Sequence, residues 1–222
     1  MVERIREGVF FTTPPALPRG RHPMARDDVV ATQRERLMIA GTELMAADGY
    51  RSVGVREIAA HARISRAAFY ECFADKDACV FAAYDRFIEV LLGAVAAPLE
   101  SPVDWPSTVN GVLEAYLATL ESDLVVARAF QVEMDALGRE ARDKRREALT
   151  GMAAVLKARR DEIWPDARDV ALDAYIGAVY AIRQLASDAL DERAEPDLLD
   201  LSRRAEPWIA RLLTGSSVPA RG

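Results

Sequence analysis

The fold is decided by residues 49–78, which read GYRSVGVREIAAHARISRAAFYECFADKDA. Apolar side chains recur at helical spacing over 55–62, and a second helical segment opens at Ser65, a residue type that caps helices. Two short helices joined by a tight turn are typical of a helix-turn-helix, whose second helix enters the major groove of DNA. Ala59 and Ala62 are small enough to let the two helices cross closely. The stretch therefore predicts a DNA-reading motif.

The same stretch resembles the DNA-binding domain of the TetR/AcrR family over roughly residues 30–80. The resemblance rests on Gly-Tyr at 49–50, on Val-Arg-Glu-Ile-Ala at 55–59, and on Ser-x-x-x-Phe-Tyr-x-x-Phe-x-x-Lys from Ser65 to Lys76. Because these elements are many and their spacing is fixed, the resemblance is specific. Beyond this region the chain is similar to the family only in length and in its helical character.

The resemblance implies a role for each matching residue. Arg66 and Ala67 would face base edges, since Arg can pair with guanine and an Ala methyl can touch the methyl group of thymine. Tyr70 and Lys76 would bind phosphates and fix the position of the protein on the duplex. Arg56 would reach the DNA backbone or a flanking base. Phe69 and Phe73 would be core residues, and His61 is expected on the surface.

Three positions depart from the family pattern. Cys72 stands where the family often has His, Gly54 stands where it usually has Thr or Ser, and Arg63 stands where it usually has Gly. We expect Arg63 to adopt a left-handed backbone conformation at a cost of roughly 1 kcal/mol, and to add a cation near the DNA. The expected DNA-binding residues are Arg56, Arg63, Ser65, Arg66, Ala67, Tyr70 and Lys76.

Outward from this motif the whole chain is predicted to be all-α, with an N-terminal three-helix DNA-binding domain and a C-terminal helical domain for ligand binding and dimerisation. Helices are expected at 28–48, 55–62, 65–72, 75–97, 107–121, 123–136, 140–163, 167–190 and 197–213. The expected domains are a flexible basic arm at 1–27, the helix-turn-helix at 28–76 and the effector and dimer region at 77–222. The arm, which is rich in proline, either follows a DNA backbone or is a disordered leader.

Charge and composition are compatible with this interpretation. The formal net charge is −6, yet residues 1–76 hold 12 Lys and Arg against 10 Asp and Glu, so the front of the chain is slightly basic. The two cysteines, Cys72 and Cys79, build no disulfide framework and have no nearby partners for a metal, so we expect a reducing cytoplasm and no cofactor. The longest apolar run, 90–99, is too short to span a membrane.

The C-terminal region offers candidates for an effector pocket and a dimer interface, both implied by the resemblance. Core packing is the simpler explanation for any single pocket residue, and an intramolecular helical hairpin is the alternative to the dimer. The pocket candidates are Tyr84, Phe87, Trp105, Tyr116, Phe130, Met134, Met152 and Tyr175. The dimer candidates are Leu172, Ile176, Val179, Leu201, Trp208, Ile209 and Leu212.

These expectations describe a ligand-responsive transcriptional regulator, a repressor, that binds a palindromic operator in double-stranded DNA as a homodimer. A small apolar or aromatic effector would release it. The alternative is a helical dimer that binds a ligand or a protein without reading DNA sequence. An enzyme is not expected, because the chain has no nucleophile elbow, no phosphate-binding glycine loop and no metal-ligand spacing.

Overall fold

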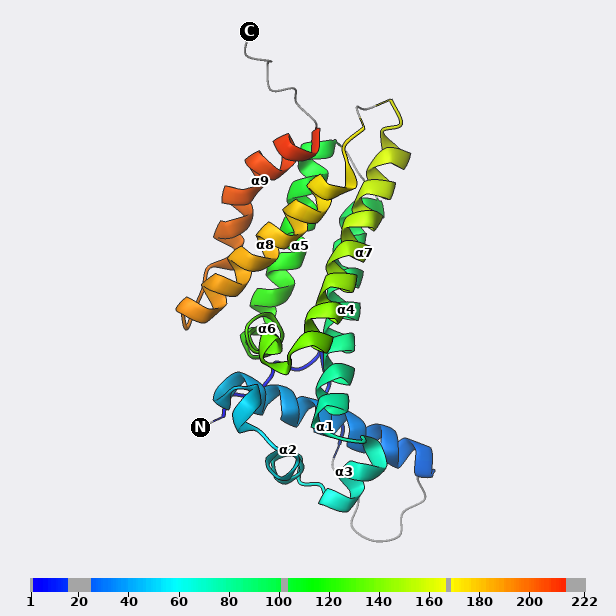
Figure 1. Ribbon diagram of the computed structural model, residues 1–222, viewed down its shortest axis with the longest axis vertical. Helices are drawn as coiled ribbons and strands as arrows, with labels where there is room; N and C mark the ends of the chain where they lie inside the picture. Colours follow the sequence, from blue (N-terminus) through cyan, green and yellow to red (C-terminus); the bar gives the residue numbers. More distant parts are fainter. Residues whose placement is uncertain (1, 16–24, 101–103, 167–168, 215–222) are drawn as a thin grey trace. The chain divides into compact units, whose positions relative to one another are not determined.

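A computed structural model describes residues 2–15, 25–100, 104–166 and 169–214 (Figure 1). Over these residues the regular structure is helical, and the only strand-type pairing is an isolated bridge between Glu7 and Phe11. The predicted all-α class is confirmed. The elements are α1 (Arg26–Asp48), η1 (Tyr50–Ser52), α2 (Val55–Ala62), α3 (Arg66–Cys72), α4 (Lys76–Glu100), α5 (Trp105–Ser122), α6 (Leu124–Gln131), η2 (Glu133–Leu137), α7 (Arg139–Ile163), α8 (Leu172–Glu192) and α9 (Leu198–Thr214).

The predicted helix boundaries agree with these elements to within a few residues, with two informative differences. The expected helix at 123–136 is divided into α6 and the 3-10 helix η2. Pro98, which was expected in a connection, lies inside α4 close to Gly111 of α5. A Cβ atom added to Gly111 would lie 3.1 Å from the Cβ of Pro98, so the glycine permits the close approach of the two helices.

The chain divides into two compact units, and the division differs from the expected boundary at residue 76. The first unit comprises Met1–Val90 and Ser122–Ala141, and the second comprises Leu91–Glu121 and Arg142–Gly222. The first unit therefore includes α6 and η2, which are distant in sequence from the DNA-binding motif. They belong to it because α6 packs on α1 and η2 on η1.

The structure differs most from the sequence-based prediction in the N-terminal segment. Residues 2–15, expected to be part of a flexible arm, are packed into the first unit, where Ile5, Phe10 and Phe11 are buried. The backbone N–H of Arg6 donates to Asp123 Oδ2 at 2.7 Å. The free energy gained by burying the apolar side chains of this segment exceeds the conformational entropy lost on ordering it. The segment has no helical or alternating period, so its sequence did not reveal this. The remainder of the expected arm, residues 16–24, lies outside the described residues.

A buried carboxylate joins this segment to the DNA-binding motif. Glu43 of α1 is 1% exposed and accepts hydrogen bonds from Arg4 Nη1 at 2.8 Å and from the Ile5 backbone N–H at 3.1 Å. On its other side Glu43 pairs with His61 Nε2 of α2 at 2.6 Å. His61, which was expected on the surface, is therefore a half-buried partner of Glu43, and α1, α2 and the N-terminal segment share one ionic cluster.

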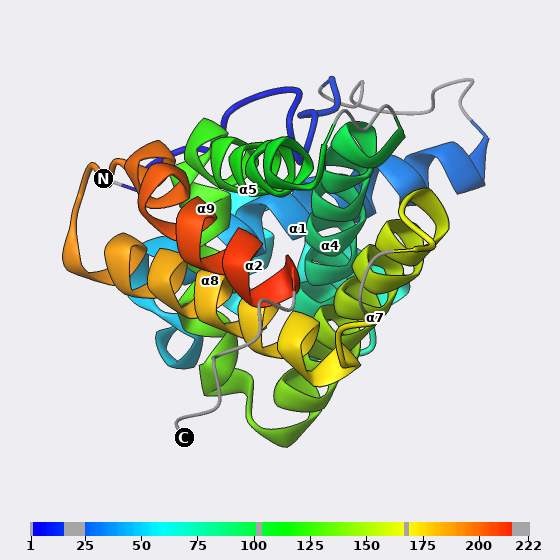
Figure 2. The ribbon, with the colours of Figure 1, turned by 90° about the horizontal axis from the view of Figure 1, so that it is seen from above.

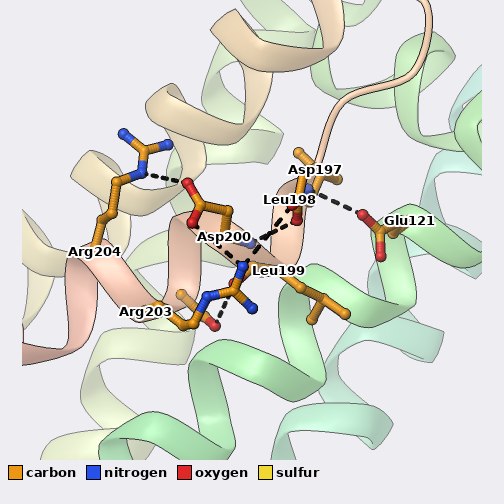
Figure 3. Close-up of polar contacts among 8 residues, drawn as sticks. Glu121, Asp197, Leu198, Leu199, Asp200, Arg203 and Arg204 are labelled. Carbon is orange, nitrogen blue, oxygen red and sulfur yellow. Dashed lines mark hydrogen bonds and ion pairs between the residues drawn. The ribbon is translucent and has the colours of Figure 1, made fainter.

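In the second unit α8 and α9 lie side by side (Figure 1, Figure 2). The first turn of α9 is satisfied by two carboxylates, since Asp197 accepts from the Asp200 N–H at 2.7 Å and Glu121, at the end of α5, accepts from the Leu198 N–H at 3.0 Å (Figure 3). Arg204 pairs with Asp200 at 2.9 Å. Negative side chains at a helix N-terminus are favourable, so these contacts fix where α9 begins.

Both cysteines are buried thiols in the first unit. Burial raises the pKa of the Cys79 thiol to about 12, and it raises the pKa of Cys72 as well. Within the described residues, no group of three or more His, Cys, Asp or Glu could hold a metal ion. No helix in the same described ranges is long and apolar enough to cross a membrane.

Candidate nucleic-acid interface and neighbouring cavity

The turn between α2 and α3 is closed by a left-handed residue. Arg63 has φ 58° and ψ 42°, as expected, and is the only non-glycine residue with positive φ in the described part of the chain. Its N–H bonds the carbonyl of Ala60 at 3.1 Å, and the Ile64 N–H bonds the carbonyl of Ala59 at 2.9 Å. This pair of bonds is a Schellman motif, in which Gly is the usual left-handed residue. The turn therefore aims α3 at the cost of strain in Arg63.

Helix α3 presents one face to solvent and the other to the core. Ser65 caps it, its Oγ accepting from the Ala68 N–H at 3.1 Å as predicted. Arg66, Ala67 and Tyr70 are exposed, and the Tyr70 side chain is exposed over about half of its surface (53%). Phe69 is fully buried in the core. The predicted base-reading and phosphate-binding residues of α3 are therefore brought together on one accessible face.

An arginine of α1 fastens the far end of α3. The guanidinium of Arg34 donates to the Cys72 carbonyl and lies over the ring of Phe73, 4.1 Å from its centroid. These contacts satisfy a terminal helix carbonyl and use a cation–π attraction. Arg34 lies outside the motif that identified the fold, and no local pattern marked it. It positions α3 without being exposed on the same face as Arg66.

Arg56 lies in the first turn of α2, and its side chain is 81% exposed. Its Nε bonds the carboxylate of Glu57 at 2.8 Å, which partly offsets its charge. Gly54 is the N-cap residue of α2, and its carbonyl accepts the Ile58 N–H at 3.1 Å. Arg56 is thus placed near the start of a helix but already has an acidic neighbour.

Lys76 is placed differently from its predicted role in phosphate binding. Its ammonium donates to the carbonyls of Tyr50 and Val53 at 3.0 and 2.9 Å, and it lies 3.7 Å from the centroid of the Tyr50 ring. Burial lowers the pKa of Lys76. The hydroxyl of Tyr50 in turn donates to Asp77. Lys76 therefore holds the first turn of α4 against η1 with two of its three donors, and its contact with a phosphate stays a prediction.

The second unit contains an apolar cavity with a volume of about 60 Å³, measured as the space open to the centre of a water molecule. Residues of α4, α5, α7, α8 and α9 line it, and four of the predicted pocket residues are among them, namely Trp105, Tyr116, Met152 and Tyr175. Arg183 of α8, which the sequence analysis did not select, also lines the cavity and is buried. Such a space is large enough for a few heavy atoms without movement of its walls.

The other four predicted pocket residues, Tyr84, Phe87, Phe130 and Met134, do not line this cavity. They are buried in the first unit, where the Phe87 ring lies 5.2 Å from that of Phe130 and 5.3 Å from that of Phe10. The ring of Phe10, from the N-terminal segment, packs against Phe87, which was predicted to contact an effector. Ordinary core packing therefore explains these four residues.

Comparison with known proteins identifies the motif. Residues 37–83 match the bacterial regulatory proteins of the tetR family. The similarity to the tetR family is therefore confined to the helix-turn-helix and the residues that flank it. The chain is 40% identical over 87 residues to the transcriptional regulator AcuR of Cereibacter sphaeroides, covering 36% of this chain and 39% of that protein. It is 29% identical over 91 residues to the transcriptional activator FasR of Mycolicibacterium smegmatis, covering 41% of this chain and 42% of that protein.

Solved structures show a likeness in fold over most of the chain. The fatty acid degradation regulator FadR from Bacillus halodurans has a TM-score of 0.73 at 15% identity, covering 91% of this chain and 100% of that one. A FadR from Bacillus subtilis in complex with stearoyl-CoA has a TM-score of 0.70 at 17% identity, covering 79% of this chain and 96% of that one. At such identities the likeness concerns the fold alone.

The expected dimer residues of the chain divide into inward and outward groups. Val179, Leu201 and Ile209 are buried within the second unit, and Val179 and Ile209 line the cavity, so these three cannot also cover a partner. Leu172 and Ile176 are half-buried. The outward group comprises the predicted residues Trp208 and Leu212 together with Tyr180 and Leu185. These four large apolar side chains form the exposed apolar face of α8 and α9.

Proposed function

We propose that this protein is a TetR-family, ligand-responsive transcriptional regulator that binds a palindromic DNA operator as a homodimer. The observation that carries the proposal is the accessible face of α3, where Arg66, Ala67 and Tyr70 are exposed behind a serine-capped N-terminus. Arg66 would read guanine, Ala67 would contact a thymine methyl, and Tyr70 would bind a phosphate. The exposed Arg63 and Arg56 would add attraction to the DNA backbone.

Selection of bound duplexes from a random pool, followed by fluorescence anisotropy, tests this reading. We expect Arg66→Ala to lose discrimination of roughly 5- to 150-fold at one base pair, because a bidentate pair contributes about 1–3 kcal/mol. Arg142→Ala, an exposed arginine of α7, is the matched control and should change nothing. Absence of any selected sequence would favour the alternative of a ligand- or protein-binding module.

A dimer is part of the proposal because α3 has only seven residues and reads few base pairs. Two copies related by a twofold axis would read half-sites about 34–36 Å apart. The exposed apolar face of α8 and α9 supports this assembly, since large exposed apolar side chains are usually covered in function. Trp208→Glu should convert the dimer to a monomer in sedimentation experiments. Val155→Glu, on the exposed surface of α7, should leave the assembly unchanged.

Repression in the ligand-free state is the proposed mode of control. Helix α4 begins at Lys76, which holds the η1 turn, and it carries Val95 and Leu99, which line the cavity. An apolar effector larger than the cavity must displace the cavity walls, and an unbroken helix can transmit that displacement to the η1 turn. The effector weakens DNA binding only if it prefers the displaced conformation. A reporter gene behind the selected operator shows the sign of regulation.

A further inference from the structure

Two residues of the cavity wall in the second unit each carry a buried polar atom that has no hydrogen-bond partner. The two atoms are the indole Nε1 of Trp105 and the hydroxyl oxygen of Tyr175. Leaving one buried donor unsatisfied costs about 1–3 kcal/mol. Because buried polar groups in proteins are nearly always paired, two orphaned groups in the wall of one apolar cavity indicate a function rather than a packing accident.

The two residues that carry the orphaned groups are in contact with each other. Trp105 is the first residue of α5, and Tyr175 lies in the first turn of α8. Their rings meet edge to face with centroids 6.5 Å apart, and Trp164 packs against Trp105 at 5.5 Å. The rings that carry the indole N–H and the phenolic hydroxyl are therefore neighbours in the cavity wall.

The two orphaned groups are hydrogen-bond donors. An indole N–H can only donate, and burial raises the pKa of Tyr175, so its hydroxyl keeps its proton at neutral pH. Positive charge is also near, because the buried guanidinium of Arg160 lies 6.0 Å from the Trp105 ring, although Asp161 shares that charge at 3.2 Å. The rest of the wall consists mainly of aliphatic side chains such as Leu113 and Leu156.

We propose that the cavity recognises an apolar molecule that carries an acceptor oxygen at one end, a carbonyl or a carboxylate, to which Tyr175 and Trp105 donate hydrogen bonds. The inference rests on the proposed ligand-responsive function and names the chemical class of the effector. The existing space of about 60 Å³ is bordered almost entirely by apolar atoms, so the walls must move before the oxygen can reach the two donors. A longer apolar body enters by separating the aliphatic walls, which links recognition of the oxygen to expansion of the cavity.

A matched pair of probes tests the proposal. The ketone 2-decanone and the alkene 2-methyl-1-decene have nearly the same shape, but only the ketone has an acceptor oxygen. Isothermal titration of the full-length protein should show about tenfold tighter binding of the ketone, since two net hydrogen bonds contribute on that scale. Decanoic acid forms a third arm. Tighter binding of the acid than of the ketone would identify the acceptor as a carboxylate, and the reverse would identify a carbonyl.

The variant Tyr175→Phe should lower the preference for the ketone over the alkene from about tenfold to about threefold or less. The same variant should leave the melting temperature of the ligand-free protein unchanged or raise it, because it removes an unpaired buried hydroxyl. A residue with only a structural role would lower the melting temperature and weaken both probes equally. Tyr116→Phe is the matched control, since Tyr116 lines the same cavity and its hydroxyl is not among the orphaned atoms.

Three results would overturn the proposal: equal binding of ketone and alkene by the unmodified protein, an unchanged preference in Tyr175→Phe, or no binding of any of the three probes. The DNA experiments on Arg66 need no small molecule. Failure of the acceptor proposal would therefore leave the DNA-reading proposal standing, and failure of DNA selection would leave the probe titrations interpretable.

Discussion

The two aromatic clusters of the protein differ in how their rings are packed. In the first unit, Phe10, Tyr84, Phe87 and Phe130 pack ring against ring, with centroids 5.2 to 6.0 Å apart. In the second unit, Trp105, Trp164 and Tyr175 meet at their edges beside a cavity and keep two donors unsatisfied. Similar residue types therefore build a filled core in one place and a receptive site in the other.

The difference follows from what each unit is proposed to do. A DNA-reading helix must be held in one position, and a densely packed core with all of its space filled resists deformation. A ligand site must accept a guest, so it keeps space and unsatisfied groups at a cost in stability. Aromatic content alone does not distinguish the two units. They differ in whether aromatic rings fill the space between the helices.

The largest effect is expected where the filled core is emptied. Phe10→Ala should lower the free energy of unfolding of the first unit by about 3–5 kcal/mol, because it removes a buried ring and leaves a cavity. Chemical denaturation followed by circular dichroism measures the change. Val155→Ala, at a side chain of the second unit that is 60% exposed, should cost less than about 0.5 kcal/mol. A loss below about 1 kcal/mol for Phe10→Ala would mean that the N-terminal segment does not belong to the core.

The next effect concerns the buried ionic cluster. Glu43→Ala should cost about 2–3 kcal/mol, because it leaves the Ile5 N–H unsatisfied and removes the partner of the half-buried His61. Glu71→Ala is the matched control, since Glu71 is exposed and lies 3.9 Å from Arg26. Denaturant titration of both variants checks the contrast, and equal losses would argue against the cluster as a link between α1 and the N-terminal segment.

A pair of enlargements compares the two cores directly. Val80→Phe in the first unit should destabilise by about 1–3 kcal/mol, because a dense core has no room for a ring. Val179→Phe, in the wall of the cavity, should cost less than Val80→Phe and should abolish binding of 2-decanone. Thermal unfolding and ligand titration give the two readouts. An equal cost at both positions would show that the cavity is no more adaptable than the core.

The smallest effect is expected at the turn of the helix-turn-helix. Arg63→Gly should stabilise the protein by about 0.5–1 kcal/mol, because glycine adopts positive φ without steric strain. The same change should weaken binding to all DNA sequences alike and reduce the salt dependence of binding, since it removes a cation without changing base contacts. Denaturation and anisotropy at several salt concentrations measure both. Destabilisation would contradict the strain assigned to Arg63.

The features that sequence predicted are those fixed by local chemistry. The cap at Ser65, the left-handed Arg63 and the exposed face of α3 each depend on residues within one or two helical turns. Helix periodicity likewise located the nine α-helices found in the described residues to within a few positions. Such features need no knowledge of distant parts of the chain.

The features that could not be predicted from the sequence depend on contacts with residues distant in the chain, or on helices with apolar residues on more than one face. Lys76 turns inward because the carbonyls of η1 lie beside it. Residues 2–15 are ordered by α1 and Asp123, which no local pattern indicates. In α8, Tyr175, Ile176, Val179 and Tyr180 are all apolar, so periodicity cannot tell the face toward the cavity from the face toward a partner.

The arginine at the turn makes the balance between folding and DNA attraction depend on the surrounding electrolyte. Its backbone strain is the same at every ionic strength, whereas its attraction to phosphates fades as dissolved ions shield it over shorter distances. When the concentration of dissolved ions rises, the backbone strain of Arg63 remains, whereas most of its proposed attraction to phosphates is lost. Under the proposed function, the contribution of Arg63 to DNA binding therefore falls as salt rises, whereas its cost in folding does not.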